Sequence, residues 1–260
     1  LPPLRPDHLR THHYQPFVQM LRANMRHAGA LRIDHVMGLM RLFWIPAGRS
    51  AREGGYVYYP LEEMLAIVAL ESQRHRCLVI GEDLGTVAPE VREALARFDV
   101  LSYRLLFFER EGDGAFKPAA AYPAQALAAV STHDLPTLAG WWTGEDLRLR
   151  LQLGLISDEA QLEQQLLDRA RHRVQLLLAV RHAGLMSAED IAQATAEPQP
   201  SPRTVEAVHA FLAEAPSLLM MVQLEDVLDV VEQANMPGTT SEQPNWQRKL
   251  PADLQALAAS

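Results

Sequence analysis

The strongest constraint on the fold is a pattern that recurs along the chain. Short runs of small and β-branched apolar residues end abruptly in charged or polar groups, which is typical of buried parallel strands. The pattern predicts four strands and a fifth, weaker one, over residues 28–35, 77–84, 126–134, 218–226 and, for the weaker strand, 102–109.

Stretches with helical periodicity separate these strands. Residues 60–74 and 89–98 each open with a proline near the first helical turn, and the region 142–202 is rich in Leu, Gln, Arg and Glu at helical spacing. The proline-rich stretch 196–202 favours a surface linker. We therefore predict an α/β fold with three parts: 1–141, a helical insertion subdomain at 142–202, and 203–260 with the last strand.

Composition narrows the class of protein. The chain has 260 residues, 48% apolar and 22% charged, with a formal charge of −8 spread among both signs, so we expect a large core and no nucleic-acid partner. No apolar run is long enough to span a membrane and the first residues do not resemble a signal peptide, so we expect a cytoplasmic protein. Cys77 has no partner cysteine and is most simply a small buried residue.

Acidic residues end all four stronger strands. These acids are Asp34, Glu82 with Asp83, Asp134, and Glu225 with Asp226. In a barrel of alternating strands and helices, such residues face the active site, although a single strand-end Asp can equally cap a helix. Retaining glycosidases need two carboxyl groups about 5 Å apart. Neighbouring parallel strands lie about 4.8 Å apart, so acids at adjacent strand ends meet that requirement.

Five segments resemble one enzyme family. RIDHVMGLMRLFWIP, VIGEDLGTV and STHDLPTLAGWW are similar, in this order, to the three catalytic segments of amylomaltases. The earlier YQPFVQMLRANMRHAGA and the later NMPGTTSEQPNWQRKL extend the resemblance over essentially the whole chain. Amylomaltases are 4-α-glucanotransferases of glycoside hydrolase family 77 in the α-amylase clan. The resemblance implies a partial (β/α)8 barrel of about strands 4–8, with the rest of the barrel as a missing N-terminal partner.

The resemblance also implies roles for three acids. Asp34 would be the nucleophile, Glu82 the general acid and then the base, and Asp134 the third acid that holds sugar hydroxyls and stabilises the distorted ring. Arg32 lies two residues before Asp34, hence on the same strand face, and its charge favours the ionised carboxylate.

Further candidates would contact the sugar. By resemblance, His133 and His35 would hydrogen-bond sugar hydroxyls, although a buried His paired to backbone is an alternative. The aromatic residues Tyr14, Phe43, Trp44, Tyr56, Tyr58, Tyr59, Trp141 and Trp142 suit glucose stacking, but most aromatic residues belong to cores. Only Tyr56 and its neighbours, in a predicted Gly-rich loop, are expected to line a cleft.

The late loop completes the expected site. Asn235, Pro237 and Gly238 have turn chemistry and, by resemblance, would close one side of the donor site. No metal or cofactor is implied.

The expected function is transfer of α-1,4-glucan segments from maltooligosaccharides, or from glucans derived from starch or glycogen, to glucose or maltose as acceptor. Transfer rather than hydrolysis follows from the resemblance, so an α-amylase-like hydrolase stays open as an alternative. A non-catalytic glucan-binding fragment is a second alternative, because an incomplete barrel exposes unpaired edges. A domain whose strand-end acids merely cap helices is a third.

Overall fold

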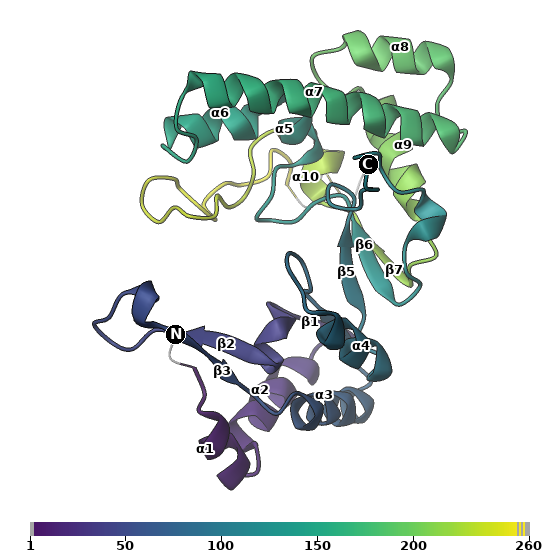
Figure 1. Cartoon of the computed structure of the whole chain (residues 1–260). Coiled ribbons are helices and arrows are strands. Elements are labelled where there is room, and N and C mark those ends of the chain that lie inside the picture. Colours follow the sequence, from purple (N-terminus) through teal and green to yellow (C-terminus); the bar gives the residue numbers. More distant parts are fainter. Residues whose placement is uncertain (1–2, 254, 256, 258–260) are drawn as a thin grey trace. The chain divides into compact units, whose positions relative to one another are not determined.

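The chain forms two compact units in the computed structural model (Figure 1). The structure describes residues 3–253, 255 and 257. The first unit comprises Leu1–Tyr103 and Gln125–Leu127, and the second comprises Arg104–Ala124 and Ala128–Ser260. Because each unit has its own core, each is described by itself.

The first unit begins with two helices and then alternates strands with helices. Its elements are α1 (Pro6–Thr11), α2 (Gln15–Met25), β1 (Ala30–Ile33), the 3-10 helix η1 (Val36–Leu39), β2 (Arg41–Trp44), η2 (Ala51–Glu53), β3 (Gly55–Tyr58), α3 (Leu61–His75), β4 (Leu78–Gly81) and α4 (Pro89–Arg97).

A parallel strand pair lies at the centre of the first unit. β1 pairs with β4 in the register Ala30↔Leu78 to Ile33↔Gly81, and a bridge joins β4 to the chain at Leu101. On α3 the buried residues Met64, Leu65 and Val68 are spaced so that one helix face packs inward. They join a core that also includes Phe17 and Leu21 of α2.

An antiparallel hairpin is the element that the sequence did not predict. β2 and β3 pair from Arg41↔Tyr58 to Trp44↔Gly55, so the region of Tyr56 is a strand and the loop predicted there is wrong. Alternating Tyr and Val favour a strand. Gly54 is required beside it, because a Cβ there would lie 2.7 Å from the Trp44 carbonyl oxygen.

The second unit is mainly helical. The chain crosses between the units within β5 (Ser102–Leu105) and β6 (Ala126–Ala129). The other elements of the second unit are η3 (Ala119–Ala121), α5 (Leu138–Thr143), α6 (Glu145–Gln152), α7 (Glu159–His182), α8 (Ala188–Ala196), α9 (Pro202–Ala213), β7 (Leu219–Met221) and α10 (Leu224–Val227). The strands form a three-stranded sheet in the order β5-β6-β7.

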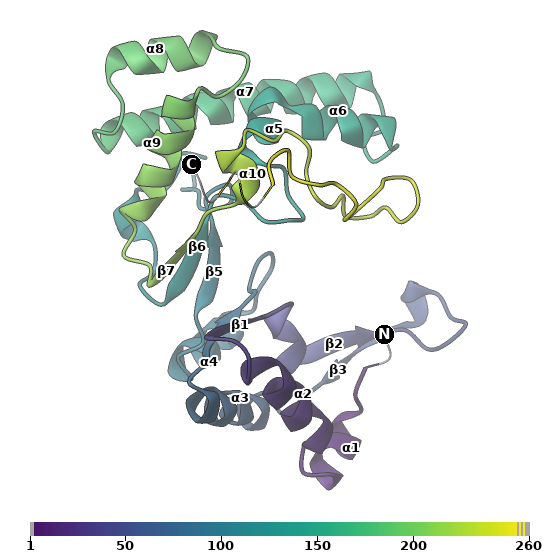
Figure 2. The same ribbon diagram turned by 180° about the vertical axis from the view of Figure 1, so that it is seen from behind.

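The long helix α7 organises the second unit, with α6 beside one half and α8 beside the other (Figure 2). Leu176, Leu177 and Val180 of α7 pack with Trp142 and Phe211 in one core. The helical periodicity of 142–202 is therefore confirmed as helix, and the proline-rich stretch lies between the end of α8 and the start of α9.

All five predicted strands exist but are shorter than predicted. The strand predicted over 218–226 differs most, since β7 ends at Met221 and α10 begins at Leu224. No helix among the described residues combines the length and apolar character needed to cross a membrane.

Candidate active site

Asp34 and Glu82 directly follow the two paired strands of the first unit. The last register pair is Ile33↔Gly81, and the pairing continues because the Glu82 amide donates to the Ile33 carbonyl at 2.9 Å. The two acids therefore leave the same end of neighbouring parallel strands, whose axes lie about 4.8 Å apart. The expectation that they stand at adjacent strand ends is met by this register.

The turn after Asp34 depends on backbone packing. His35 adopts a left-handed conformation with φ 44°, and Val36 then donates its amide to the Glu82 carbonyl at 3.0 Å. A Cβ on Gly81 would lie 3.0 Å from the Val36 side chain. Glycine at this position thus lets the turn cross close to β4.

Asp34 is paired with a local cation. Arg32 donates to the Asp34 carboxylate at 2.8 Å, and the Asp34 side chain is 79% exposed. The Arg32 guanidinium lies 5.3 Å from the centre of the Tyr103 ring. Burial raises the pKa of Tyr103, with the charge of Arg32 acting in the opposite direction. The strand face thus presents a carboxylate that is exposed to a ligand and is held by one cation.

Backbone donors orient Glu82. Its two carboxyl oxygens accept hydrogen bonds from the amides of His35 at 2.9 Å and Leu84 at 2.8 Å. The neighbouring Asp83 has a different environment: it is 1% exposed, accepts from the Tyr103 amide at 2.8 Å and lies 3.5 Å from Arg92. Of the two adjacent acids, Glu82 is available to a ligand and Asp83 supports the fold.

Tyr56 and His35 line the same small cavity of about 80 Å³ in the first unit. Arg41 lies over the Tyr56 ring at 4.3 Å, and the Phe43 ring meets its edge at 5.2 Å. Tyr56 is exposed, so an aromatic face is available next to the turn after Asp34. Sequence reasoning missed Arg41, whose only signal was its position in the RIDHVMGLMRLFWIP segment.

The other aromatic candidates divide into two groups. Four are buried core residues, namely Tyr14, Tyr59, Trp141 and Trp142, whereas Phe43 and Tyr58 are exposed and Trp44 is half-buried. The general expectation that aromatic residues belong mostly to the core therefore holds for the buried four.

In the second unit, Asp134 and His133 meet Asn235. The Asn235 side chain donates to the Asp134 carboxylate at 2.6 Å, and the backbone amide of Asn235 donates to the His133 carbonyl at 3.1 Å. The His133 ring nitrogen Nε2 lies 3.3 Å from Asp134, and both side chains are nearly half exposed. The structure thus joins two segments that the sequence had singled out separately.

The loop that carries Asn235 is braced by its own residues. Gln233 donates to the Asn235 carbonyl, and the Met236 amide donates to the Asn245 side chain at 2.9 Å. Pro237 and Gly238 are exposed, and Gly238 has φ 89°, a conformation that favours glycine. The structure thus places both residues at an accessible turn.

Trp246 is a neighbour that sequence reasoning did not single out. Its ring lies 5.1 Å from the His133 ring and is 63% exposed. The only available signal was its position in the late NMPGTTSEQPNWQRKL segment.

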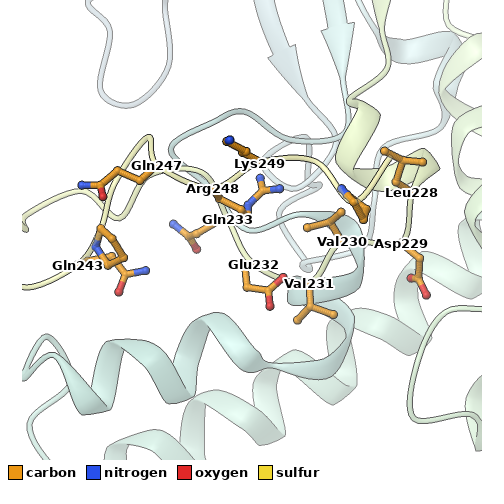
Figure 3. A pocket seen from close by; sticks show the side chains of 12 residues that line it. Leu228, Asp229, Val230, Val231, Glu232, Gln233, Gln243, Gln247, Arg248 and Lys249 are labelled. Carbon is orange, nitrogen blue, oxygen red and sulfur yellow. The ribbon is translucent and has the colours of Figure 1, made fainter. Parts of the chain in front are cut away.

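A larger cavity of about 730 Å³ opens beside this region (Figure 3). Residues 228–233 line it together with Gln243, Gln247, Arg248 and Lys249. Its lining combines amide and charged side chains with apolar ones, since Pro244 and Pro251 join Leu228, Val230 and Val231 there.

Glu225 and Asp226, which were predicted to end a strand, lie in α10 instead. Asp226 is 3% exposed and accepts from the Leu138 amide at the start of α5 at 2.7 Å, so this acid supports the start of a distant helix. Glu225 pairs with Arg248 at 3.0 Å. In the described part of the chain, no three His, Cys, Asp or Glu side chains are arranged to hold a metal ion.

Known proteins similar to this chain form a consistent group. The family model for glycoside hydrolase family 77, described as 4-alpha-glucanotransferase, matches residues 1–255. The 4-alpha-glucanotransferase of Haemophilus influenzae is 42% identical over 254 residues, covering 98% of this chain and 36% of the relative. That of Mycobacterium tuberculosis is 43% identical over 251 residues, covering 94% of this chain and 33% of the relative. The chain thus spans about a third of the length of these relatives.

Two solved structures are also similar. The amylomaltase from Corynebacterium glutamicum matches with a TM-score of 0.88 and 32% identity, covering 96% of this chain and 36% of the other. An amylomaltase from Streptococcus agalactiae in complex with acarbose matches with a TM-score of 0.68 and 19% identity, covering 97% and 43%. At that identity the second match speaks for the fold alone.

Proposed function

The chain belongs to the 4-alpha-glucanotransferase family, glycoside hydrolase family 77, and from this membership we propose that it carries the catalytic acids of a retaining 4-α-glucanotransferase. Such an enzyme moves α-1,4-glucan segments from a maltooligosaccharide donor to a sugar acceptor through a covalent aspartyl-glycosyl intermediate. The observation that carries the proposal is the strand pairing that ends in Ile33↔Gly81, because it sets Asp34 and Glu82 side by side.

The first half of the reaction uses this pair. The Asp34 carboxylate attacks the anomeric carbon of the donor, and the bond to the leaving glycosidic oxygen breaks. Glu82 gives its proton to that oxygen, so that the shortened glucan leaves as an alcohol. The ion pair with Arg32 keeps Asp34 directed along its strand face.

The second half reverses these roles. Glu82, now a carboxylate, takes the proton of the acceptor 4-hydroxyl as that oxygen attacks the anomeric carbon, which is bonded to Asp34 in the glycosyl ester. The new glycosidic bond forms and Asp34 is released. The two backbone bonds to Glu82 orient one carboxyl group for both proton transfers. Transfer requires that acceptor subsites favour the sugar hydroxyl over water.

Asp134 is the third acid in this proposal. It holds sugar hydroxyls and stabilises the distorted ring, with Asn235 fixing its carboxylate and His133 as a hydroxyl donor. His35 and Tyr56 contact sugar near the nucleophile, which their shared cavity supports. Pro237 and Gly238 border the donor site.

The fold belongs to the same proposal: a partial (β/α)8 barrel of about strands 4–8 with a helical insertion over 142–202. Open strand edges support it. Among the described residues no strand pairs with the outer edge of β1 or of β7, and Leu218, Met221 and Val222 are exposed at β7. An apolar strand edge of this kind calls for a further strand, supplied by the N-terminal part of the barrel.

The proposed partners are α-1,4-glucans. Donors are maltooligosaccharides and glucans derived from starch or glycogen, glucose and maltose are acceptors, and the cytoplasm is the proposed location. Exposed carboxylates and aromatic faces, rather than a basic surface, support a neutral sugar substrate.

The test is to incubate the protein with maltotriose and to identify the sugars that form. Transfer yields glucose together with oligosaccharides longer than maltotriose, whereas a hydrolase yields only glucose and maltose. A fluorinated glycosyl donor then traps the intermediate, and peptide mapping is expected to place the label on the peptide that contains Asp34. A label on another peptide, or turnover that survives Asp34→Ala, would overturn the assigned mechanism.

A further inference from the structure

Two segments of the second unit that lie far apart in the sequence are joined at several points. One is residues 131–140, which contains His133 and Asp134, and the other is residues 224–236, which contains Asn235. The contact between Asn235 and Asp134 lies at the solvent-facing end of this junction, since both groups are partly exposed. Buried contacts beneath this junction add to the support that Gln233 and Asn245 give the Asn235 loop.

Asp226 is a buried acidic residue of the junction. Its side chain is fully buried, and Oδ1 accepts the Leu138 amide at 2.7 Å. Leu138 is the first residue of α5 and lies four positions after Asp134. A charge-assisted hydrogen bond to the helix start therefore fixes the point from which the Asp134 loop departs.

Thr137 and Gly140 add a second connection. The Thr137 hydroxyl donates to the Val231 carbonyl at 3.1 Å and accepts from the Gly140 amide at 3.0 Å. A Cβ on Gly140 would lie 2.4 Å from the Val231 carbonyl oxygen. Only glycine permits this approach, so the backbone before Asn235 is seated directly on the first turn of α5.

The loop between Asp134 and Leu138 is short and has little conformational freedom. Pro136 separates Asp134 from Thr137, and the Ser131 hydroxyl donates to the Pro136 carbonyl at 2.7 Å. Little freedom remains for Asp134 once Leu138 is held. On the other side of Asp226, His209 of α9 lies 3.6 Å from Oδ2.

We propose that Asp226 is a positioning residue for the reaction: it fixes Leu138 at the start of α5, whose first turn supports the Val231 backbone, and so sets Asp134 and Asn235 in the geometry that the transition state requires. We name this set, Asp226, Thr137, Leu138, Gly140 and Val231, the Asp226 clasp. The inference rests on the proposed function for its catalytic consequence, but the clasp itself is a structural statement that stands or falls separately.

The experiment compares three variants with the wild type. Asp226→Ala removes the acceptor for Leu138, whereas Asp226→Asn keeps an oxygen acceptor and removes the charge. Asp146→Ala is the matched control, because Asp146 is another buried carboxylate of the second unit, 8% exposed and bound to Arg169 at 2.8 Å. Amide hydrogen exchange is followed in peptides that cover 132–138 and 230–236, relative to the other peptides of the unit.

Asp226→Ala is expected to speed amide exchange in those two peptides more than in the rest of the unit. Asp226→Asn should have the same effect to a smaller extent, and Asp146→Ala should not favour those two peptides over the others. Equal exchange patterns in Asp226→Ala and Asp146→Ala would overturn the clasp whatever the enzyme does. This readout needs no turnover, so a failure of the clasp and a failure of the proposed function are distinguishable.

The catalytic arm uses maltotriose and a double-mutant cycle. Asp226→Ala is expected to lower kcat by about 10²-fold, the scale expected for a misplaced catalytic group, with KM little changed and with partial rescue in Asp226→Asn. In an Asp134→Ala background the same change should cost little more, because its effect passes through Asp134. A loss of equal size in both backgrounds would assign Asp226 a purely structural role and refute the positioning function.

Discussion

Glu82 of the first unit and Asp134 of the second unit are held in opposite ways. In the first unit, Glu82 is oriented by backbone amides of its own strand end and of the neighbouring turn, at His35 and Leu84. In the second unit, Asp134 is oriented by the side chain of Asn235, which lies 101 positions away. The first arrangement follows once two strands pair, whereas the second requires two distant loops to be seated on each other.

This difference predicts different sensitivities to mutation. Backbone donors cannot be removed by changing a side chain, so the orientation of Glu82 should resist substitutions around it. The Asp134 geometry depends on individual side chains and should fail when one is truncated. Substitutions at the individual acids and at the residues that support them test this contrast.

The largest effect is expected from removing the nucleophile. Asp34→Ala should lower the rate of glucose release from maltotriose by roughly 10⁴-fold or more, the scale seen when a central catalytic group is deleted. The control is Asp7→Asn, which breaks an exposed ion pair with Arg5 in the same unit and should leave the rate unchanged. A rate comparable to wild type in Asp34→Ala would exclude Asp34 as the nucleophile.

Glu82→Gln should lower the rate by about 10³-fold, within the range for a general acid. The side-chain carboxamide keeps one oxygen, which can still accept a hydrogen bond from the backbone amide of His35 or of Leu84. The fold should therefore be kept, and the loss is chemical. A donor with a good leaving group, such as a glycosyl fluoride, needs no proton for the first step. Formation of the intermediate from that donor should therefore recover, and a variant that is equally slow with both donors would contradict the acid role.

Asn235→Ala tests the contrast most directly. It removes the donor to Asp134 and should lower kcat by about 10²-fold through misplacement of that carboxylate. Asn24→Ala, which loses only a bond to the Met20 carbonyl on the exposed face of α2, is the matched control. An Asn235→Ala enzyme with normal kcat would show that Asp134 needs no distant side chain for its orientation. The contrast with Glu82 would then disappear.

Glycine substitutions probe the packing beneath each acid. Gly140→Ala places a Cβ against the Val231 carbonyl, and Gly81→Ala places one at 3.0 Å from the Val36 side chain. Overpacking typically costs about 1–3 kcal/mol, and Gly140→Ala should lie at the upper end because a carbonyl in the clasp cannot rotate away. Denaturant unfolding measures both, with Gly112→Ala, where nothing lies within 4 Å, as control.

The sequence predicted the parts of the molecule that depend on short-range pattern. The five strands, the helices at 61–75 and 89–97 and the enzyme family are confirmed. Each follows from local periodicity or from a contiguous motif. The hairpin of β2 and β3 escaped prediction because ten residues separate its strands, so no tight-turn signal marks it.

Adjacent acids show where sequence reasoning stops. Glu82 and Asp83 directly follow β4, and successive side chains of an extended chain point to opposite sides, so only one of them is expected to face the core. Which one does so depends on which side of this segment the rest of the unit packs against. Likewise, only the folded chain reveals that Asp226 supports α5 and that Asn235 meets Asp134, because these contacts join residues 88 and 101 positions apart.

The smallest effect concerns pH and the base of the clasp. Burial by itself lowers the pKa of His209, but the Asp226 carboxylate and the Val205 carbonyl outweigh it and raise the pKa above its ordinary value. Glu206 and Asp229 also line the cavity of about 330 Å³ beside His209 and Asp226. A raised pKa in the folded state means that the protonated form stabilises the fold.

That stabilisation is complete below about pH 6.5, the ordinary value for His, and is lost as pH rises through the raised pKa. Unfolding measured in denaturant from pH 5.5 upward should therefore show the free energy of unfolding falling over this window in the wild type. In Asp226→Asn and in His209→Gln the fall should be reduced. No comparable pair lies beneath Glu82, where Asp83 meets Arg92, which stays charged throughout. If the free energy of unfolding fell equally in Asp226→Asn, the Asp226 carboxylate would not be what raises the pKa of His209. Of the two described partners of the Asp226 side chain, only Leu138 would then remain.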